Sequence, residues 1–176
     1  MTALGPHALD LPEALAQLEL QRLAWLYCHA VDRGDMALLR SLYTDDATDD
    51  HGGMFRGTAE EYVAWLPAML AALDATRHTI DSMLFVVAGD RAQGELVNTA
   101  YHRTGDQEVI VRGRYLDSYA RRDGIWRIRH RSLVMDAFEQ RTTSEAGGFI
   151  GKGVEWGTAD SSDPVHTRLD LFSRQD

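Results

Sequence analysis

The sequence predicts an α+β protein in which three N-terminal helices precede a curved antiparallel sheet. Helical periodicity dominates residues 12–73, whereas residues 78–137 alternate strand-forming runs with tight turns. Helices segregated from consecutive strands are typical of α+β folds and not of doubly wound ones. The 176 residues, 44% of them hydrophobic, are enough for one domain with its own core. Such a sheet must curl around its helices, and we expect a mostly apolar pocket at one mouth of the curled sheet.

Apolar periodicity after a leader of residues 1–11 predicts the first two helices. One stripe recurs at i, i+3, i+4, i+7 and i+11, and it consists of Leu20, Leu23, Ala24, Tyr27 and Val31. Gly34 is a typical helix-ending residue, and Asp35 can cap a short second helix. These signals place two consecutive helices at the start of the domain.

A short hairpin and a third helix follow. The pair Gly52-Gly53 favours a tight turn between two short strands. Thr58 and Glu61 have the spacing of a capping box, which indicates a helix start. Trp65 lies on the apolar stripe of this helix, and Pro67 is expected to kink or restart it.

Four antiparallel strands are predicted as a meander at residues 78–88, 91–103, 108–122 and 125–137. Asp123-Gly124 is the strongest hairpin signal in the sequence. Together with the helices these strands define a cone domain over residues 12–140. Residues 141–176 contain glycines among aromatic and aliphatic residues. We interpret them as an irregular arm of the same domain that covers the pocket or a neighbouring subunit.

Charge and cysteine content restrict the class of partner. The net charge of −9 disfavours nucleic acid, and no apolar run reaches the roughly 20 residues that span a bilayer. Cys28 is the only cysteine, which excludes an internal disulfide and fits a reducing compartment. The N-terminus lacks the pattern of a secretory signal. We therefore expect a cytoplasmic protein that binds neither nucleic acid nor membranes.

The last strand carries an alternating pattern that predicts which side chains face the interior. Arginines alternate with apolar residues and one histidine: Arg127, Arg129 and Arg131 against Trp126, Ile128 and His130. Because arginines do not fit an enclosed interior, His130 is predicted to point inward as a substrate-binding residue. The arginine rows are expected on the outer face, paired with acidic residues or with another subunit. Such a face predicts a homo-oligomer, either a dimer or a trimer.

Tyr27, Asp32 and His78 are the candidate catalytic residues. Tyr27 lies on the buried stripe of the first helix, and Asp32 follows five residues later at the helix C-terminus. His78 begins the first long strand. If Asp32 contacts His78, the carboxylate fixes the tautomer of the imidazole and leaves the other ring nitrogen free to move protons. Taken singly, Asp32 fits a solvated turn residue and His78 a hydrogen-bonded boundary residue.

The remaining candidates are expected to bind substrate. His102 shares a strand face with Asn98, although a core histidine bonded to a backbone carbonyl fits equally well. Residues 45–50 are acidic but lack EF-hand spacing, so we expect a solvated turn there, with His51 as a pocket residue. Trp65 of the third helix is a further pocket candidate. The sequence predicts no cofactor and no metal site.

Several motifs resemble the SnoaL-like branch of the nuclear-transport-factor-2-like superfamily. They are Tyr27-Cys-His-Ala-Val-Asp32-Arg-Gly-Asp, Leu42-Tyr43-x-Asp45-Asp46-Ala47, the isolated His78, Gly113-Arg-Tyr-x-Asp117 and Arg121-Arg-Asp-Gly-x-Trp126-Arg-Ile. The resemblance covers residues 15–140 and implies a conical α+β barrel with a deep pocket. Its relatives include scytalone dehydratase, a bile-acid dehydratase and polyketide cyclases. The arm after residue 140 lies outside the resemblance.

The resemblance also implies roles for particular residues. Dehydratase-type relatives use an aspartate after the first helix and a histidine at the start of the first long strand, commonly with a tyrosine. Asp32, His78 and Tyr27 occupy those positions. Where many relatives carry an asparagine a few residues later, this chain has Asp81-Ser82.

The favoured hypothesis is a cofactor-independent lyase that acts on a hydrophobic cyclic or aromatic small molecule. His78 removes a proton from carbon, and Asp32 orients the ring and stabilises the imidazolium. Tyr27, with His102 or His130, polarises or protonates the departing oxygen, and the same proton shuttling allows C–C cleavage. Two alternatives stay open. One is an isomerase that is similar to ketosteroid isomerases or to polyketide cyclases. The other is a non-catalytic ligand-binding subunit.

Overall fold

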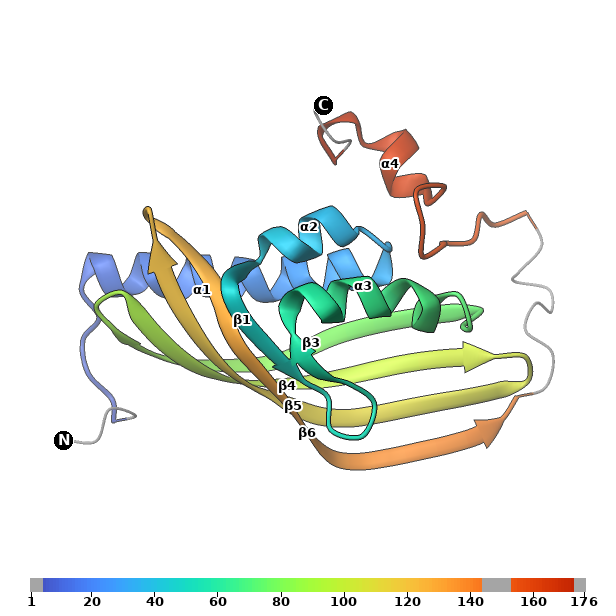
Figure 1. The fold of residues 1–176 in the computed structure, drawn as a ribbon, viewed down its shortest axis with the longest axis horizontal. Helices are drawn as coiled ribbons and strands as arrows, with labels where there is room; N and C mark the ends of the chain where they lie inside the picture. The colour runs from blue at the N-terminus through green and yellow to red at the C-terminus, as the bar shows by residue number, and fades with distance from the viewer. Residues whose placement is uncertain (1–4, 144–152, 173–176) are drawn as a thin grey trace.

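The computed structural model describes residues 5–143 and 153–172, and it has the predicted α+β architecture (Figure 1). The elements in chain order are α1 (Leu11–Asp32), α2 (Met36–Ser41), β1 (Tyr43–Asp50), β2 (Arg56–Thr58), α3 (Ala59–Leu70), β3 (Ala75–Ala88), β4 (Arg91–Thr104), β5 (Gln107–Arg122), β6 (Ile125–Thr142), α4 (Pro164–Arg168) and the 3-10 helix η2 (Asp170–Phe172). The predicted order of helices, hairpin, helix and meander is confirmed.

The strands form one twisted sheet in the order β2-β1-β6-β5-β4-β3. β3 to β6 pair antiparallel as a meander, while β1 pairs parallel with β6 and antiparallel with β2. Figure 1 shows the sheet curling beneath α1, α2 and α3, which lie together over one face. The sheet is open, so β3 is an edge strand at one side of the cone.

The helix boundaries follow the capping signals in the sequence. Asp10 caps α1, and the Asp35 side chain caps α2 by accepting a hydrogen bond from the Leu38 amide at 2.9 Å. Gly34 joins these helices with a φ of +62°, a conformation that disfavours residues with a Cβ. The capping box at the start of α3 is present. Helix α3 continues through Pro67 as one element, so the expected restart does not occur, although Pro67 has no N–H to donate to the Val63 carbonyl.

The core fills the space between the three helices and the concave face of the sheet. Its fully buried side chains are large and come from both layers: Leu20, Tyr27, Leu39, Tyr43, Leu66, Leu96, Tyr119 and Ile128. Removing a leucine side chain of this kind from water contributes about 1.5–3 kcal/mol to folding. The interior is thus apolar in bulk, with the tyrosine hydroxyls as embedded polar groups.

A β-bulge in β6 corrects two predictions. Ser118 pairs with His130 and Tyr119 pairs with Ile128, which leaves Arg129 as an extra residue on β6. The extra residue reverses the in-and-out alternation beyond it. His130 is therefore exposed on the outer face, where its Nδ1 lies 2.7 Å from the Thr48 hydroxyl, and the prediction that it lines the interior is wrong. Arg131, expected outside, is instead buried.

Several of the other strand arginines form ion pairs on the outer face, whereas Arg127 donates a hydrogen bond to the Ser41 carbonyl oxygen. Four of them contact acidic residues on neighbouring strands or turns: Arg112 with Glu139, Arg114 with Glu95 and Asp136, Arg121 with Asp90, and Arg122 with Asp46. Exposed pairs of this kind contribute little, about 0–1 kcal/mol each. The convex surface therefore carries both positive and negative charges and is not a basic patch.

The described part of the arm, residues 153–172, returns to the turn between α1 and α2. Arg33 forms an ion pair with the buried Asp163 at 3.2 Å and donates a hydrogen bond to the Thr158 carbonyl. A Cβ on Gly34 would lie 2.2 Å from the Ala159 carbonyl oxygen, so backbone meets backbone there. The glycine-rich residues 144–152 lie outside the described residues. Residues 158–172 lie against the C-terminal end of α1 and the turn that follows it.

Candidate active site

Asp32 and His78 meet at the edge of the sheet. Asp32 is the last residue of α1, and His78 lies in the edge strand β3. The His78 amide donates to Oδ2 of Asp32 at 2.8 Å, and Nδ1 of His78 lies 2.7 Å from Oδ1. An edge strand has backbone amides without a strand partner, and here Asp32 accepts from one of them. One carboxylate thus binds both the backbone and the ring of the same histidine.

This arrangement fixes the orientation and tautomer of His78. The side chains of Asp32 and His78 are only 9% and 10% exposed, so water competes little for the contact. Because a carboxylate accepts hydrogen bonds, Nδ1 of His78 carries the proton. Nε2 of His78 has no hydrogen-bond partner within residues 5–143 and 153–172. In the neutral ring Nε2 is then the unprotonated nitrogen, which is the form that accepts a proton.

The pair lines an open hollow of about 940 Å³. Asp32 and Arg33 form one side, and residues 73–79 at the start of β3 form another. Trp156 to Ala159 of the arm complete the lining. The arm therefore covers this hollow in part, which agrees with one of the two places predicted for it.

His102 and Asn98 lie on the inner face of β4. The ring of His102 packs edge-on against His78 with centroids 5.4 Å apart, and its Nδ1 lies 3.1 Å from the Thr76 hydroxyl. Burial lowers the pKa of His102 from 6.5 to about 4, and the nearby His78 acts in the same direction. His102 is thus a neutral neighbour at physiological pH. Asn98 is 2% exposed, and its Oδ1 has no hydrogen-bond partner in the described chain.

Tyr27 lies deeper than the Asp32–His78 pair. Its hydroxyl is 2.9 Å from the hydroxyl of Tyr62 on α3, and the residue is 1% exposed. Burial raises the pKa of Tyr27 well above 10, so the hydroxyl keeps its proton at neutral pH. No hydrogen bond joins Tyr27 to Asp32 or His78 among the described residues. The structure thus places Tyr27 in the same interior without direct contact with the pair.

His51 and Trp65 flank Tyr62 on the other side of the interior. The His51 ring stacks on Tyr62 with centroids 5.2 Å apart, and the Trp65 ring lies 6.0 Å from Tyr62. Nδ1 of His51 contacts the carboxylate of Asp49 at 2.5 Å. His51 is therefore an interior residue. The solvated turn expected at residues 45–50 is instead part of strand β1, and the alternation along this strand turns Asp49 inward.

Arg131 is an interior residue that sequence reasoning missed. Its guanidinium forms a bidentate ion pair with Asp117, with N–O distances of 2.9 and 2.5 Å. The guanidinium carbon also lies 4.0 Å from the ring centroids of Tyr27 and Tyr115. Its Nη1 has no hydrogen-bond partner in the part of the chain that is described. This group offers a fixed positive charge and a free N–H donor beside Tyr27.

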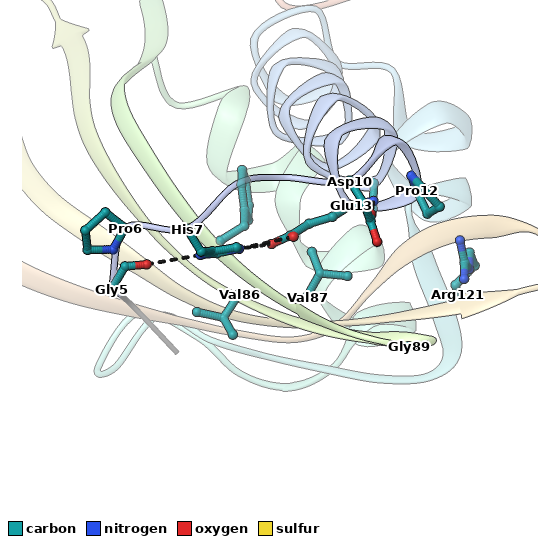
Figure 2. A pocket seen from close by; sticks show the side chains of 12 residues that line it. Gly5, Pro6, His7, Asp10, Pro12, Glu13, Val86, Val87, Gly89 and Arg121 are labelled. Atoms are coloured by element: carbon teal, nitrogen blue, oxygen red, sulfur yellow. Dashed lines mark hydrogen bonds and ion pairs between the residues drawn. The ribbon is translucent and has the colours of Figure 1, made fainter. Parts of the chain in front are cut away.

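A separate hollow of about 820 Å³ lies at the other end of α1 (Figure 2). Residues 5–7 of the leader, the first turn of α1 and Val86 to Gly89 surround it. Its titratable contact is an exposed pair between His7 and Glu13 at 3.1 Å. Because this hollow contains neither Asp32 nor His78 and its polar groups are exposed, the candidate active site is assigned to the other end of the helix.

No group of three or more His, Cys, Asp or Glu side chains in residues 5–143 and 153–172 is arranged to hold a metal ion. Among the helices described, none has the length and apolar character needed to cross a bilayer.

Comparison with known families identifies the class of protein. The family model described as a SnoaL-like domain matches residues 12–132, which is more than half of the chain. The protein belongs to the SnoaL-like domain family. Among curated proteins, no sequence matches this chain.

Solved structures show the same fold at low sequence identity. A hexachlorocyclohexane dehydrochlorinase, LinA type 2, is 20% identical with a TM-score of 0.73, over 83% of this chain and 100% of that chain. A proposed scytalone dehydratase from Novosphingobium aromaticivorans DSM 12444 is 20% identical with a TM-score of 0.68, over 76% and 92%. The beta subunit of a proposed aromatic-ring-hydroxylating dioxygenase from the same organism is 19% identical with a TM-score of 0.60, over 70% and 91%. The scaffold is therefore shared by proteins described as enzymes and as subunits.

Proposed function

We propose that the protein is a lyase that eliminates water or a related small group from a hydrophobic cyclic molecule, with its own side chains as acid and base. The observation that carries the proposal is the double contact between Asp32 and His78, which fixes the imidazole ring of His78 beside a hollow. Proteins named as a dehydratase and a dehydrochlorinase share the fold, which supports an elimination reaction.

The elimination begins with proton abstraction from carbon. Nε2 of His78 takes a proton from a carbon acidified by a neighbouring carbonyl group, and Asp32 stabilises the resulting imidazolium. Each well-placed acid or base contributes about 10²–10⁴-fold to the rate. The electron pair left on carbon then expels the leaving group from the next carbon. The same first step serves C–C cleavage when the leaving group is a carbon fragment.

The neighbouring residues are suited to bind and polarise rather than to abstract protons. His102 is neutral, because its pKa is lowered to about 4, and its ring fixes one side of His78. Tyr27 stays protonated, so we assign it hydrogen-bond donation toward substrate oxygen through the Tyr27–Tyr62 hydroxyl pair. Trp65 and Asn98 are assigned to substrate contact. His130 has no role, since its side chain lies on the outer face.

The first test compares variants on a panel of cyclic β-hydroxy ketones of one to three rings, followed by the absorbance of the enone product. We expect His78→Gln and Asp32→Asn each to lower kcat by at least ~10²-fold, since each removes a group of the acid–base pair. His130→Gln is the matched control, because it removes an exposed imidazole and should keep full activity. Full activity in either interior variant, with circular dichroism unchanged, contradicts the proposal.

A non-catalytic ligand-binding subunit is the second candidate, and the likeness to a dioxygenase beta subunit favours it. Proton exchange separates the two candidates without a known leaving group. In D₂O, the lyase exchanges the α-hydrogens of a bound cyclic ketone, and His78→Gln stops the exchange. A binding subunit leaves the ketone unexchanged in both proteins.

A further inference from the structure

The interior contains a second imidazole–carboxylate pair, formed by Asp49 of β1 and His51 just after it. Nδ1 of His51 lies 2.5 Å from Oδ1 of Asp49, and the Asp49 side chain is fully buried. Oδ2 of Asp49 accepts a hydrogen bond from the Tyr43 hydroxyl at 2.6 Å. Both carboxylate oxygens are thus occupied, as they are in Asp32. This pair has the same chemistry as the Asp32–His78 pair.

The His51 ring lies between the helix layer and the sheet. One face stacks on Tyr62 of α3 with an interplanar angle of 10°, and Tyr115 of β5 approaches edge-on at 6.1 Å. The ring keeps 11% of its side-chain surface exposed, close to the 10% of His78. Nε2 of His51 has no hydrogen-bond partner within the described ranges 5–143 and 153–172.

The two pairs approach one interior from opposite sides. β1 and β3 are separated in the sheet by β6, β5 and β4. Both histidines lie on the face that the helices cover, because His78 contacts Asp32 of α1 and His51 stacks on Tyr62 of α3. Tyr62 and Tyr115, which contact His51, also contact Tyr27, through a 2.9 Å hydroxyl contact and an edge-on ring contact at 5.7 Å. Tyr27 in turn precedes Asp32 on α1. Aromatic rings therefore connect the two pairs.

The elimination needs an acid that the first pair does not supply. His130 lies outside, His102 stays neutral, and Tyr27 is a weaker acid than free tyrosine because burial raises its pKa. His51 is the other interior imidazole held by a carboxylate. The Asp49 carboxylate and the face of Tyr62 both attract an imidazolium, and Arg131 lies beyond Tyr115 with its charge paired to Asp117.

We propose that His51, held by Asp49 as an imidazolium, is the general acid that protonates the departing oxygen at the end of the substrate opposite His78, whose ring starts the reaction in the neutral form. The inference rests on the proposed lyase function. In the step, the carbon–oxygen bond breaks, its electron pair stays on oxygen, and the Nε2 proton of His51 converts the departing hydroxide into water. His78 has gained the proton from carbon, and solvent returns one proton to His51 and removes one from His78. Protons and electrons therefore balance over a turnover.

A leaving-group series tests the role of His51 separately from that of His78. The probes are 3-methoxycyclohexanone, whose methoxide must be protonated as it leaves, and 3-(4-nitrophenoxy)cyclohexanone, whose nitrophenolate leaves as a stable anion. We expect His51→Gln to slow methanol release by about 10²-fold while it changes nitrophenolate release far less. His78→Gln should slow both reactions, because both start with proton abstraction. His130→Gln again serves as the control.

Each outcome bears on a particular statement. If His51→Gln lowers the rates of methanol and nitrophenolate release equally, or lowers neither, the role of His51 is overturned and the lyase proposal stands. No release from either probe by the wild-type protein overturns the lyase proposal and the inference with it. Asp49→Asn should reproduce the leaving-group selectivity of His51→Gln.

Discussion

Single residues at the site show how far chemistry could be predicted from the chain. Asp32 and His78 were singled out because one ends a helix and the other begins a strand, and the structure brings them within hydrogen-bonding distance. The sequence could not reveal that Asp32 also binds the His78 amide, since that contact depends on β3 being the edge strand. It also could not reveal the Asp49–His51 contact, which depends on local backbone geometry after β1. Their catalytic roles stay predictions.

His102 gives a pH prediction at the residue scale. Its pKa is lowered from 6.5 to about 4 in the folded protein, so the unfolded chain binds more protons between these values. Stability is then complete above pH 6.5 and declines as the pH falls toward 4. His102→Gln lacks this titration and should lose less stability than wild type over that interval, by on the order of 1–2 kcal/mol after allowance for partial exposure.

Urea unfolding at pH 7 and pH 4.5 measures the effect as a difference between the two proteins, which cancels the titration of the common carboxylates. A stability difference between wild type and His102→Gln that does not change with pH contradicts the account of this buried, neutral imidazole.

At the scale of elements, the sequence patterns predict the type and order of the helices and strands. They do not predict which residues of a strand face the interior. Capping residues and Asp123-Gly124 placed the helices and the last hairpin, because these signals act locally. The alternation in β6 was interpreted with a constant period of two. The bulge at Arg129 breaks that period, and it depends on pairing with β5, which no local pattern records. His130 and Arg131 were therefore assigned to the wrong faces.

The cross-strand pair that results from this bulge gives a stability prediction. Arg131 and Asp117 join β6 to β5 in the buried interior, with side chains 1% and 0% exposed. Arg131→Met leaves Asp117 buried without its partner and should lower the free energy of unfolding by about 3–5 kcal/mol. Adding Asp117→Leu removes the unpaired charge and should restore much of the loss. Chemical denaturation of the single and double variants measures both values.

A destabilisation of Arg131→Met that persists unchanged in the double variant contradicts this explanation. It would mean that contacts of the guanidinium with Tyr27 and Tyr115 carry the stability, and not the charge pairing with Asp117.

At the scale of the whole molecule, the fold gathers the polar groups of distant segments on one concave face. Helix α1 supplies Tyr27 and Asp32 and α3 supplies Tyr62, while β3 and β4 supply His78 and His102. The α+β class could be predicted because helix and strand signals are segregated along the chain, whereas the conical shape was expected only from the family resemblance. The path of the arm could not, because Arg33 and Asp163 meet over a sequence separation that carries no periodic signal. A homo-oligomer formed through the outer face stays a prediction, which light scattering can measure.

The central claim is that Asp32 holds His78 as an Nδ1-protonated ring with Nε2 free. Long-range ¹H–¹⁵N correlation spectra of histidine-labelled protein at neutral pH measure the tautomer of His78 directly. The account predicts a protonated Nδ1, an unprotonated Nε2, and a change in this pattern in Asp32→Asn but not in His130→Gln. A His78 ring protonated at Nε2, or one that is insensitive to Asp32→Asn, would contradict it.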